Sequence, residues 1–128
     1  MYTNALLVFL GAGAGGVARW GAQEACARQF GKQFPWGTLA VNVLGCLLVG
    51  FLAAMFATSW NIREEYRLGL IVGFLGGFTT FSAFGRETFV LATGHQLGWA
   101  LANIALSVGL GLAAVWAGAW LAGRVGGT

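Results

Sequence analysis

Four long apolar runs dominate this sequence of 128 residues and restrict what it can fold into. The runs cover about 5–24, 37–58, 68–92 and 97–122. A membrane-spanning helix needs about 20 apolar residues, and each run is long enough. The runs are continuous, whereas the strands of a membrane barrel alternate apolar and polar residues. The sequence therefore predicts an all-α membrane protein with a single domain of four transmembrane helices.

Charged residues are too rare to cover a water-facing surface. They make up 9% of the chain, whereas an ordinary soluble domain has roughly a quarter. The excess of seven Lys and Arg over four Asp and Glu is too small for a patch that binds nucleic acid. The sequence also lacks a Ser/His/Asp, Cys/His or metal-binding set. The composition thus disfavours a nucleic-acid-binding protein and an enzyme.

The positive charges give no clear orientation in the membrane. The side that holds both termini has three of them, Arg63, Arg67 and Arg124. The opposite side holds or adjoins four, Arg19, Arg28, Lys32 and Arg86. Because the positive-inside rule depends on an imbalance, two alternatives stay open: a weakly biased single orientation, or dual topology with both insertions. Dual topology permits an antiparallel homodimer with a two-fold axis in the membrane plane, similar to the inverted repeats of larger transporters.

The third run carries the strongest local signal, the segment Gly73–Phe84, which reads GFLGGFTTFSAF. A Gly pair followed by two Thr is poor helix-forming material in the middle of a span. We predict a helix broken there; the alternative is a continuous packing surface whose Thr hydroxyls bond to the preceding turn. A break would free backbone carbonyls, which in lipid must be satisfied by protein, water or an ion. Repeated small residues, at Gly11/Gly15 and Gly69/Gly73/Gly77, permit close helix packing between or within subunits.

Side chains on three of the runs could line a path for a small anion. Phe81 and Phe84 share a helix face, and the edge of an aromatic ring is electropositive. Asn42 lies inside the second run, where its amide can bond a neighbouring helix or donate to a passing anion. The fourth run carries a stripe at four-residue spacing, for which helix–helix hydrogen bonding is the better interpretation taken alone. It consists of Asn103, Ser107 and Gly111.

Ionisable residues avoid the middle of the runs. Arg19 and Glu87 are the most clearly inside them, each near the far end of its span. Arg19 could extend to the membrane surface. A proton-coupled carrier would lack its usual carboxylate at mid-membrane.

Four segments, in order, resemble the Fluc fluoride channels, also called the CrcB family. They are GAGAGGVARW (Gly11–Trp20), GTLAVN (Gly37–Asn42), the Gly73–Phe84 segment and Glu87. The resemblance implies a passive fluoride-selective channel in the bacterial inner membrane that exports F⁻ and reduces fluoride toxicity. It implies a dual-topology homodimer with two pores, each built from both subunits.

The resemblance also implies roles for residues along the anion path. The pore phenylalanines of the family fall on Phe81 and Phe84, and its pore asparagine falls on Asn42. Its polar track on the fourth helix falls on Ser107. Here the sequence departs from the family, because Gly111 stands where a second hydroxyl is expected.

A structural Na⁺ on the two-fold axis is the cofactor that the resemblance implies. The backbone carbonyls that would hold it belong to Gly76 and Thr79, one set from each subunit. Thr38 and Arg19 match family positions near the pore vestibule, and Glu87 matches a polar position near the end of the pore.

Two alternatives belong to other functional classes. A small proton-coupled multidrug exporter is also a four-span, dual-topology protein, but it needs a carboxylate in the first span. Glu24, at the very end of that span, is the candidate. A non-transporting membrane assembly subunit would explain the glycines, but not the Thr-Thr-Phe-Ser segment. Without the resemblance, the residues favour a path for a small ion and do not name the ion.

Overall fold

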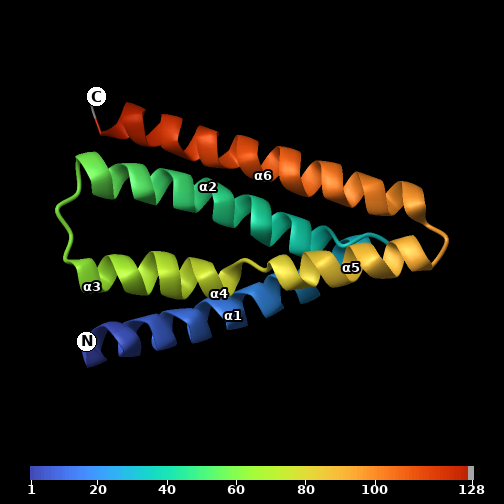
Figure 1. Cartoon of the computed structure of the whole chain (residues 1–128), viewed down its shortest axis with the longest axis horizontal. Helices are drawn as coiled ribbons and strands as arrows, with labels where there is room; N and C mark the ends of the chain where they lie inside the picture. Colours follow the sequence, from blue (N-terminus) through green and yellow to red (C-terminus); the bar gives the residue numbers. More distant parts are fainter. Residues whose placement is uncertain (127–128) are drawn as a thin grey trace.

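The computed structural model describes residues 1–126, and within them it is all-helical (Figure 1). The elements are α1 (Tyr2–Phe30), α2 (Trp36–Thr58), α3 (Glu64–Arg67), η1 (Leu68–Leu75), α4 (Gly76–Phe78), α5 (Phe81–Thr93) and α6 (Leu97–Val125). Four helical stretches are long and apolar enough to cross a membrane: Tyr2–Phe30, Trp36–Thr58, Glu64–Thr93 and Leu97–Val125. The predicted all-α architecture with four candidate spans is confirmed.

Short connections make consecutive spans antiparallel. The N-terminus, the C-terminal end of α6 and the α2–α3 connection lie at one end of the bundle, and the other two connections lie at the opposite end (Figure 1). α1 ends at Phe30, and Gly31 after it has a φ of 84°, a conformation that favours glycine. Pro35 precedes the first residue of α2, where its missing N–H costs no helical hydrogen bond.

Two close helix packings hold the bundle together. α2 packs mainly against α6, and α1 packs mainly against η1 and α4. A Cβ atom on Gly11 or Gly15 of α1 would overlap backbone atoms of η1 or α4. Likewise, a Cβ on Gly50 of α2 or Gly118 of α6 would overlap the backbone of the opposite helix. Glycine lets these backbones touch, so the small-residue spacings serve packing within one chain.

The third span consists of several elements. Helical backbone runs from Glu64 to Phe78, and within it η1 has the wider i→i+5 hydrogen bonding. Thr79 and Thr80 then adopt extended backbone, with φ/ψ of −88°/157° and −152°/112°. α5 begins at Phe81. We call the two extended residues the helix interruption.

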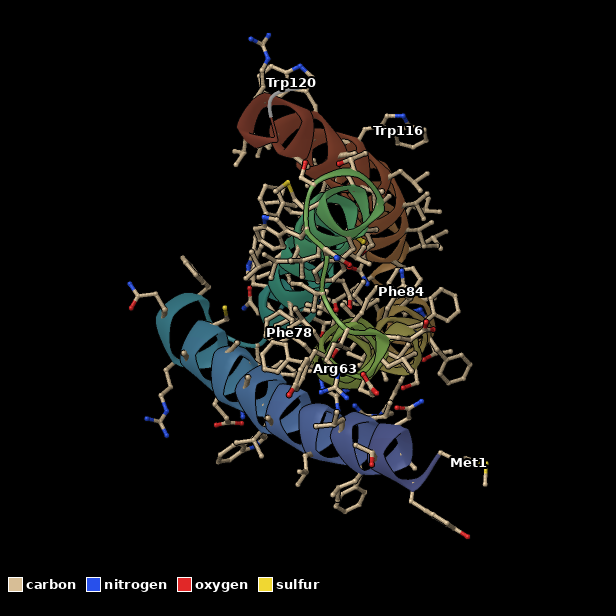
Figure 2. The ribbon with its side chains drawn as sticks, turned by 90° about the vertical axis from the view of Figure 1, so that its left-hand side faces the viewer. Met1, Arg63, Phe78, Phe84, Trp116 and Trp120 are labelled. Carbon is tan, nitrogen blue, oxygen red and sulfur yellow. The ribbon has the colours of Figure 1, made fainter. Side chains whose placement is uncertain are left out.

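Large apolar side chains cover much of the outer surface. Trp116 and Trp120 are 71% and 59% exposed and project from α6 away from the other helices (Figure 2). Phe81 is 83% exposed in the single chain. The most deeply buried side chains lie on α2 and α6: Met55, Val41 and Asn103. Such an apolar exterior suits lipid or another membrane chain rather than water.

Candidate functional site

A cavity of about 380 Å³ lies at the helix interruption. Its walls come from α2, η1, α4, α5 and α6 and from the interruption itself. Four of the predicted path residues line it, Asn42, Phe81, Phe84 and Ser107, and so do both residues predicted to hold a cation, Gly76 and Thr79. The fold therefore gathers residues from three apolar runs around one space. We call it the inner cavity.

The amide of Asn42 pairs with the backbone of Thr80. Its Nδ2 donates to the Thr80 carbonyl at 3.0 Å, and its Oδ1 accepts from the Thr80 N–H at 2.7 Å. The backbone N–H and C=O of the buried Thr80 are thereby hydrogen-bonded, although the extended backbone there makes no regular helical hydrogen bonds. An amide nitrogen carries two hydrogens, so one N–H of Asn42 remains beyond the bond to Thr80. Asn42 thus bonds a neighbouring segment and can still donate into the inner cavity.

Side-chain oxygens accept two backbone N–H groups that would bond carbonyls in a continuous helix. In a continuous α-helix, the N–H of Thr80 would bond the Gly76 carbonyl, and that of Ala83 would bond the Thr79 carbonyl. Instead, Thr80 N–H donates to Asn42, and Ala83 N–H donates to the Thr80 hydroxyl at 3.1 Å. The carbonyls of Gly76 and Thr79 are therefore released from their helical donors. Hard cations are bound by oxygen ligands of this kind.

Two phenylalanines stand at the start of α5. The rings of Phe81 and Phe84 have centroids 5.5 Å apart at an interplanar angle of 45°. Phe81 is the first helical residue after Thr80, which caps α5 with its side chain. A helix N-terminus carries unpaired N–H groups and partial positive charge. Both phenylalanines and the N-terminal end of α5 thus border the inner cavity.

The polar residues of α6 form a hydrogen-bonded chain with α5. Ser107 Oγ donates to Asn103 Oδ1 at 3.3 Å, and Asn103 Nδ2 donates to Thr88 Oγ1 at 2.9 Å. The predicted helix–helix hydrogen bonding is thus present, through the buried Asn103. Gly111 is buried, and a Cβ there would lie 3.6 Å from the sulfur of Cys46.

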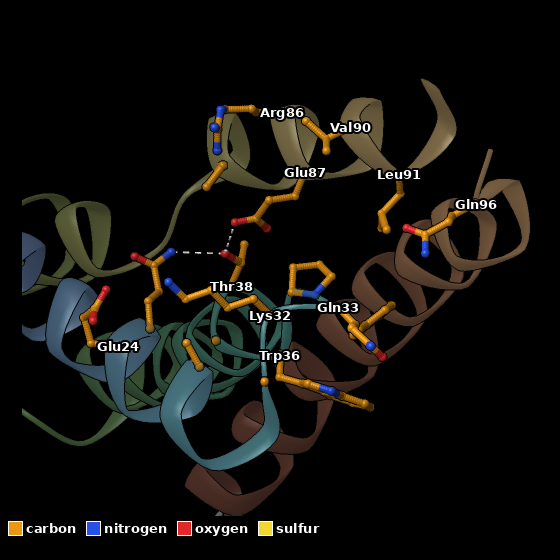
Figure 3. Close-up of a pocket in the computed structure, with 17 residues that line it drawn as sticks. Glu24, Lys32, Gln33, Trp36, Thr38, Arg86, Glu87, Val90, Leu91 and Gln96 are labelled. Atoms are coloured by element: carbon orange, nitrogen blue, oxygen red, sulfur yellow. Dashed lines mark hydrogen bonds between the residues drawn. The ribbon is translucent and has the colours of Figure 1, made fainter. Parts of the chain in front are cut away.

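A second cavity, of about 730 Å³, lies at the end of the bundle that holds the α1–α2 connection; we call it the outer cavity. Gln23 Nε2 donates to Thr38 Oγ1 at 3.0 Å, and Thr38 Oγ1 donates to Glu87 Oε1 at 2.8 Å (Figure 3). Glu87 Oε2 is buried and has no hydrogen-bond partner in the part of the chain that the structure describes. Thr38 and Glu87, singled out on separate runs, are thus in direct contact.

Some site features differ from what the sequence indicates. Arg19 is half-buried on α1 and lines neither of these two cavities. Sequence reasoning missed Gln23, which lies one helical turn after Arg19. It also missed the pairing of Asn42 with Thr80, which are 38 positions apart. The sequence does offer one signal for Gln23. It is a polar residue four positions after Arg19, so both lie on the same face of a mainly apolar helix.

Comparison with known proteins places the chain in a family. The family model described as CrcB-like protein, Camphor Resistance (CrcB), matches residues 6–119. A relative from Coxiella burnetii, named fluoride-specific ion channel FluC, is 51% identical over 118 residues, covering 90% of this chain and 94% of the relative. A relative of the same name from Rhizobium etli is 49% identical and covers 90% of this chain and 92% of the relative.

A longer relative carries the same name. That protein, from Methylococcus capsulatus, is 43% identical over 125 residues, covering 98% of this chain but 55% of the relative. The match of the family model and the identities near one half both extend over nearly the whole chain, and they confirm the resemblance found in the sequence. This chain is therefore a multi-pass membrane protein that belongs to the CrcB family.

Proposed function

We propose that this chain forms a fluoride-selective channel in the bacterial plasma membrane, through which F⁻ leaves the cell passively. The names of its relatives identify fluoride. The observation that carries the mechanism is the inner cavity, which brings two phenylalanine rings, an amide donor and a helix N-terminus together. Fluoride export of this kind would reduce fluoride toxicity.

Fluoride is small and strongly hydrated, so the channel must replace the water that the ion loses. In the inner cavity, the edges of Phe81 and Phe84 offer weakly positive C–H groups. The free N–H of Asn42 offers a hydrogen bond, and the Ser107 hydroxyl can offer a second by turning from Asn103 Oδ1, to which it donates at 3.3 Å in this structure. Each interaction is modest, which suits conduction because an ion must leave as readily as it enters.

The inner cavity is incomplete in one chain, and we propose that a second, antiparallel copy closes it. Gly76 and Phe81 line the cavity but are exposed in the single chain. The nearly even distribution of positive charges permits both insertions. Two chains related by a two-fold axis would then form two equivalent pores, each lined by both subunits.

We propose that the carbonyls of Gly76 and Thr79 hold a structural Na⁺ at the dimer axis. Their release from helical donors supports this assignment, since a carbonyl in lipid needs another partner. The described residues contain no group of three or more His, Cys, Asp or Glu that could hold a metal. A bound cation would supply positive charge that offsets the anion's charge nearby.

Removal of sodium tests the cation site. Purified protein dialysed into a buffer with a large organic cation in place of Na⁺ should lose fluoride flux by about tenfold, because a ligand that binds the assembled state stabilises it. Adding Na⁺ back should restore the flux, whereas the same concentration of K⁺ should not. Full flux after exhaustive dialysis, with sodium undetectable by atomic emission, would contradict the sodium assignment.

The physiological role is tested in bacteria that lack their own fluoride exporter. Expression of this chain should raise the fluoride concentration at which such cells grow, and a Phe81→Ile/Phe84→Ile variant should not. Equal fluoride sensitivity with and without the protein, when immunoblots detect it in the membrane fraction, would contradict the role. The drug-exporter alternative has weaker support, because Glu24 is exposed near the C-terminal end of α1.

A further inference from the structure

The hydrogen bonds around Thr38 have a fixed direction. A hydroxyl has one hydrogen to donate, and an amide nitrogen can only donate. Because Gln23 Nε2 donates to Thr38 Oγ1, the Thr38 hydrogen is free for another acceptor, and that acceptor is Glu87 Oε1. Hydrogen bonds that all donate in the same direction thereby link three side chains, one each from α1, α2 and α5 (Figure 3). We call this set the latch: Gln23, Thr38 and Glu87.

The latch holds a carboxyl group against the wall of the outer cavity. Glu87 Oε1 is engaged by Thr38, and Oε2 is buried. The stem of Gln23 is itself fixed, because it packs against Gly37 so closely that a Cβ there would lie 3.3 Å from Gln23 Cβ. The other charged residues that line this cavity are Glu24, Lys32 and Arg86. The Glu87 carboxyl group is held at the wall with Oε2 buried, so Glu24 is the other negative group facing the two positive groups.

We propose that Gln23 is a positioning residue for conduction. By donating to Thr38 it holds the Glu87 carboxyl group against the wall of the outer cavity, with Oε2 buried, so that this mouth stays favourable for an anion. This inference rests on the proposed function, since it concerns the entry of fluoride. Without the Gln23 donor, the Thr38 hydroxyl can turn away, and Glu87 is released into the cavity. A released carboxylate repels fluoride at the mouth.

The test measures fluoride efflux from liposomes that contain the full-length protein, with fluoride as the probe. Gln23→Met keeps the side-chain stem and removes the donor. We expect flux about fivefold below wild type at an ionic strength of about 0.01 M, where the Debye length is about 30 Å. At about 1 M, with an impermeant salt, the Debye length is about 3 Å, and flux should return toward wild type. The loss should come from a higher fluoride concentration for half-maximal flux, with the maximum unchanged.

The matched control is Gln29→Met, which changes an exposed glutamine on the same helix. It should equal wild type at both ionic strengths. Thr38→Val breaks the latch from its other side and should reproduce the salt-dependent loss, which keeps the test available if Gln23→Met folds poorly. In a Glu87→Gln background, which removes the charge, Gln23→Met should have no further effect.

A loss that is the same at low and high salt would overturn the inference, because it would show a purely structural role for Gln23. Wild-type flux in Gln23→Met and Thr38→Val would also overturn it, while the fluoride channel itself would stand. Absence of fluoride flux in the wild-type protein would remove both the inference and the proposed function. The wild-type measurement therefore separates the two failures.

Discussion

The two cavities satisfy their polar groups in opposite ways. In the inner cavity, the Asn42 amide bonds the backbone of Thr80, and the described lining includes no charged residue. In the outer cavity, Gln23, Thr38 and Glu87 bond one another, and charged side chains line the space. An unpaired backbone group is costly deep in an apolar bundle, whereas a charge near the end of a helix can reach water.

The two cavities show that one proposed anion path can combine fixed dipoles with full charges. The inner cavity offers fixed dipoles and aromatic rings at short range, which the bulk salt screens little because they lie inside the bundle. The outer cavity offers full charges whose effect depends on the ionic strength of the solution. Substitutions in the inner cavity should therefore change flux equally at all salt concentrations, and those in the latch should not.

The largest effect is expected at Asn42, where loss of the amide leaves both backbone groups of Thr80 unsatisfied. Each such group costs several kcal/mol in a bilayer, so Asn42→Leu should abolish flux and lower the thermal stability of the purified protein. Asn61→Leu changes an asparagine in the α2–α3 connection that is exposed, and it serves as the control. A stable Asn42→Leu protein with normal flux would contradict the structural role of the pairing.

A smaller but still large effect is expected for the two rings. Phe81→Ile and Phe84→Ile remove the electropositive edges, and an aromatic interaction of about 1 kcal/mol at each ring predicts a loss of flux of about fivefold per ring. Stability should change little for Phe81, which is exposed in the single chain. Phe89→Ile, on the exposed side of the same helix, should conduct normally. Normal flux in both ring variants, or a loss that disappears at high salt, would argue against conduction along ring edges.

The smallest effect is expected at Gly111, where this chain lacks a hydroxyl. Gly111→Ser adds a group toward Cys46, and its Cβ fits at 3.6 Å, an ordinary contact distance. We expect flux to rise by about twofold, because a neutral hydrogen bond at the weak end of the usual range contributes only about 0.5 kcal/mol. Gly109→Ser, at an open position on the same helix, should leave flux unchanged. A decrease confined to Gly111→Ser would show that the path needs space there rather than a donor.

The sequence predicted the spans from a local pattern and named six of the residues that line the inner cavity. Apolar length indicates a span, and the Gly-Gly-x-Thr-Thr pattern points to residues 76–80. Local patterns do not predict which side chains of different runs contact each other. Asn42 could equally face an anion or a helix, and its bonds to Thr80 follow from how α2 packs against the third span. Gln23 resembles any polar residue near the end of a helix until Thr38 is seen beside it.

The most direct test of the central claim is ion efflux from liposomes that hold the purified protein. Fluoride is followed with a fluoride electrode, and chloride is followed in parallel as the control. A fluoride-selective channel should give rapid loss of fluoride while chloride is retained. Equal loss of both ions, or no loss of either from protein shown to be folded, would contradict a fluoride-selective channel.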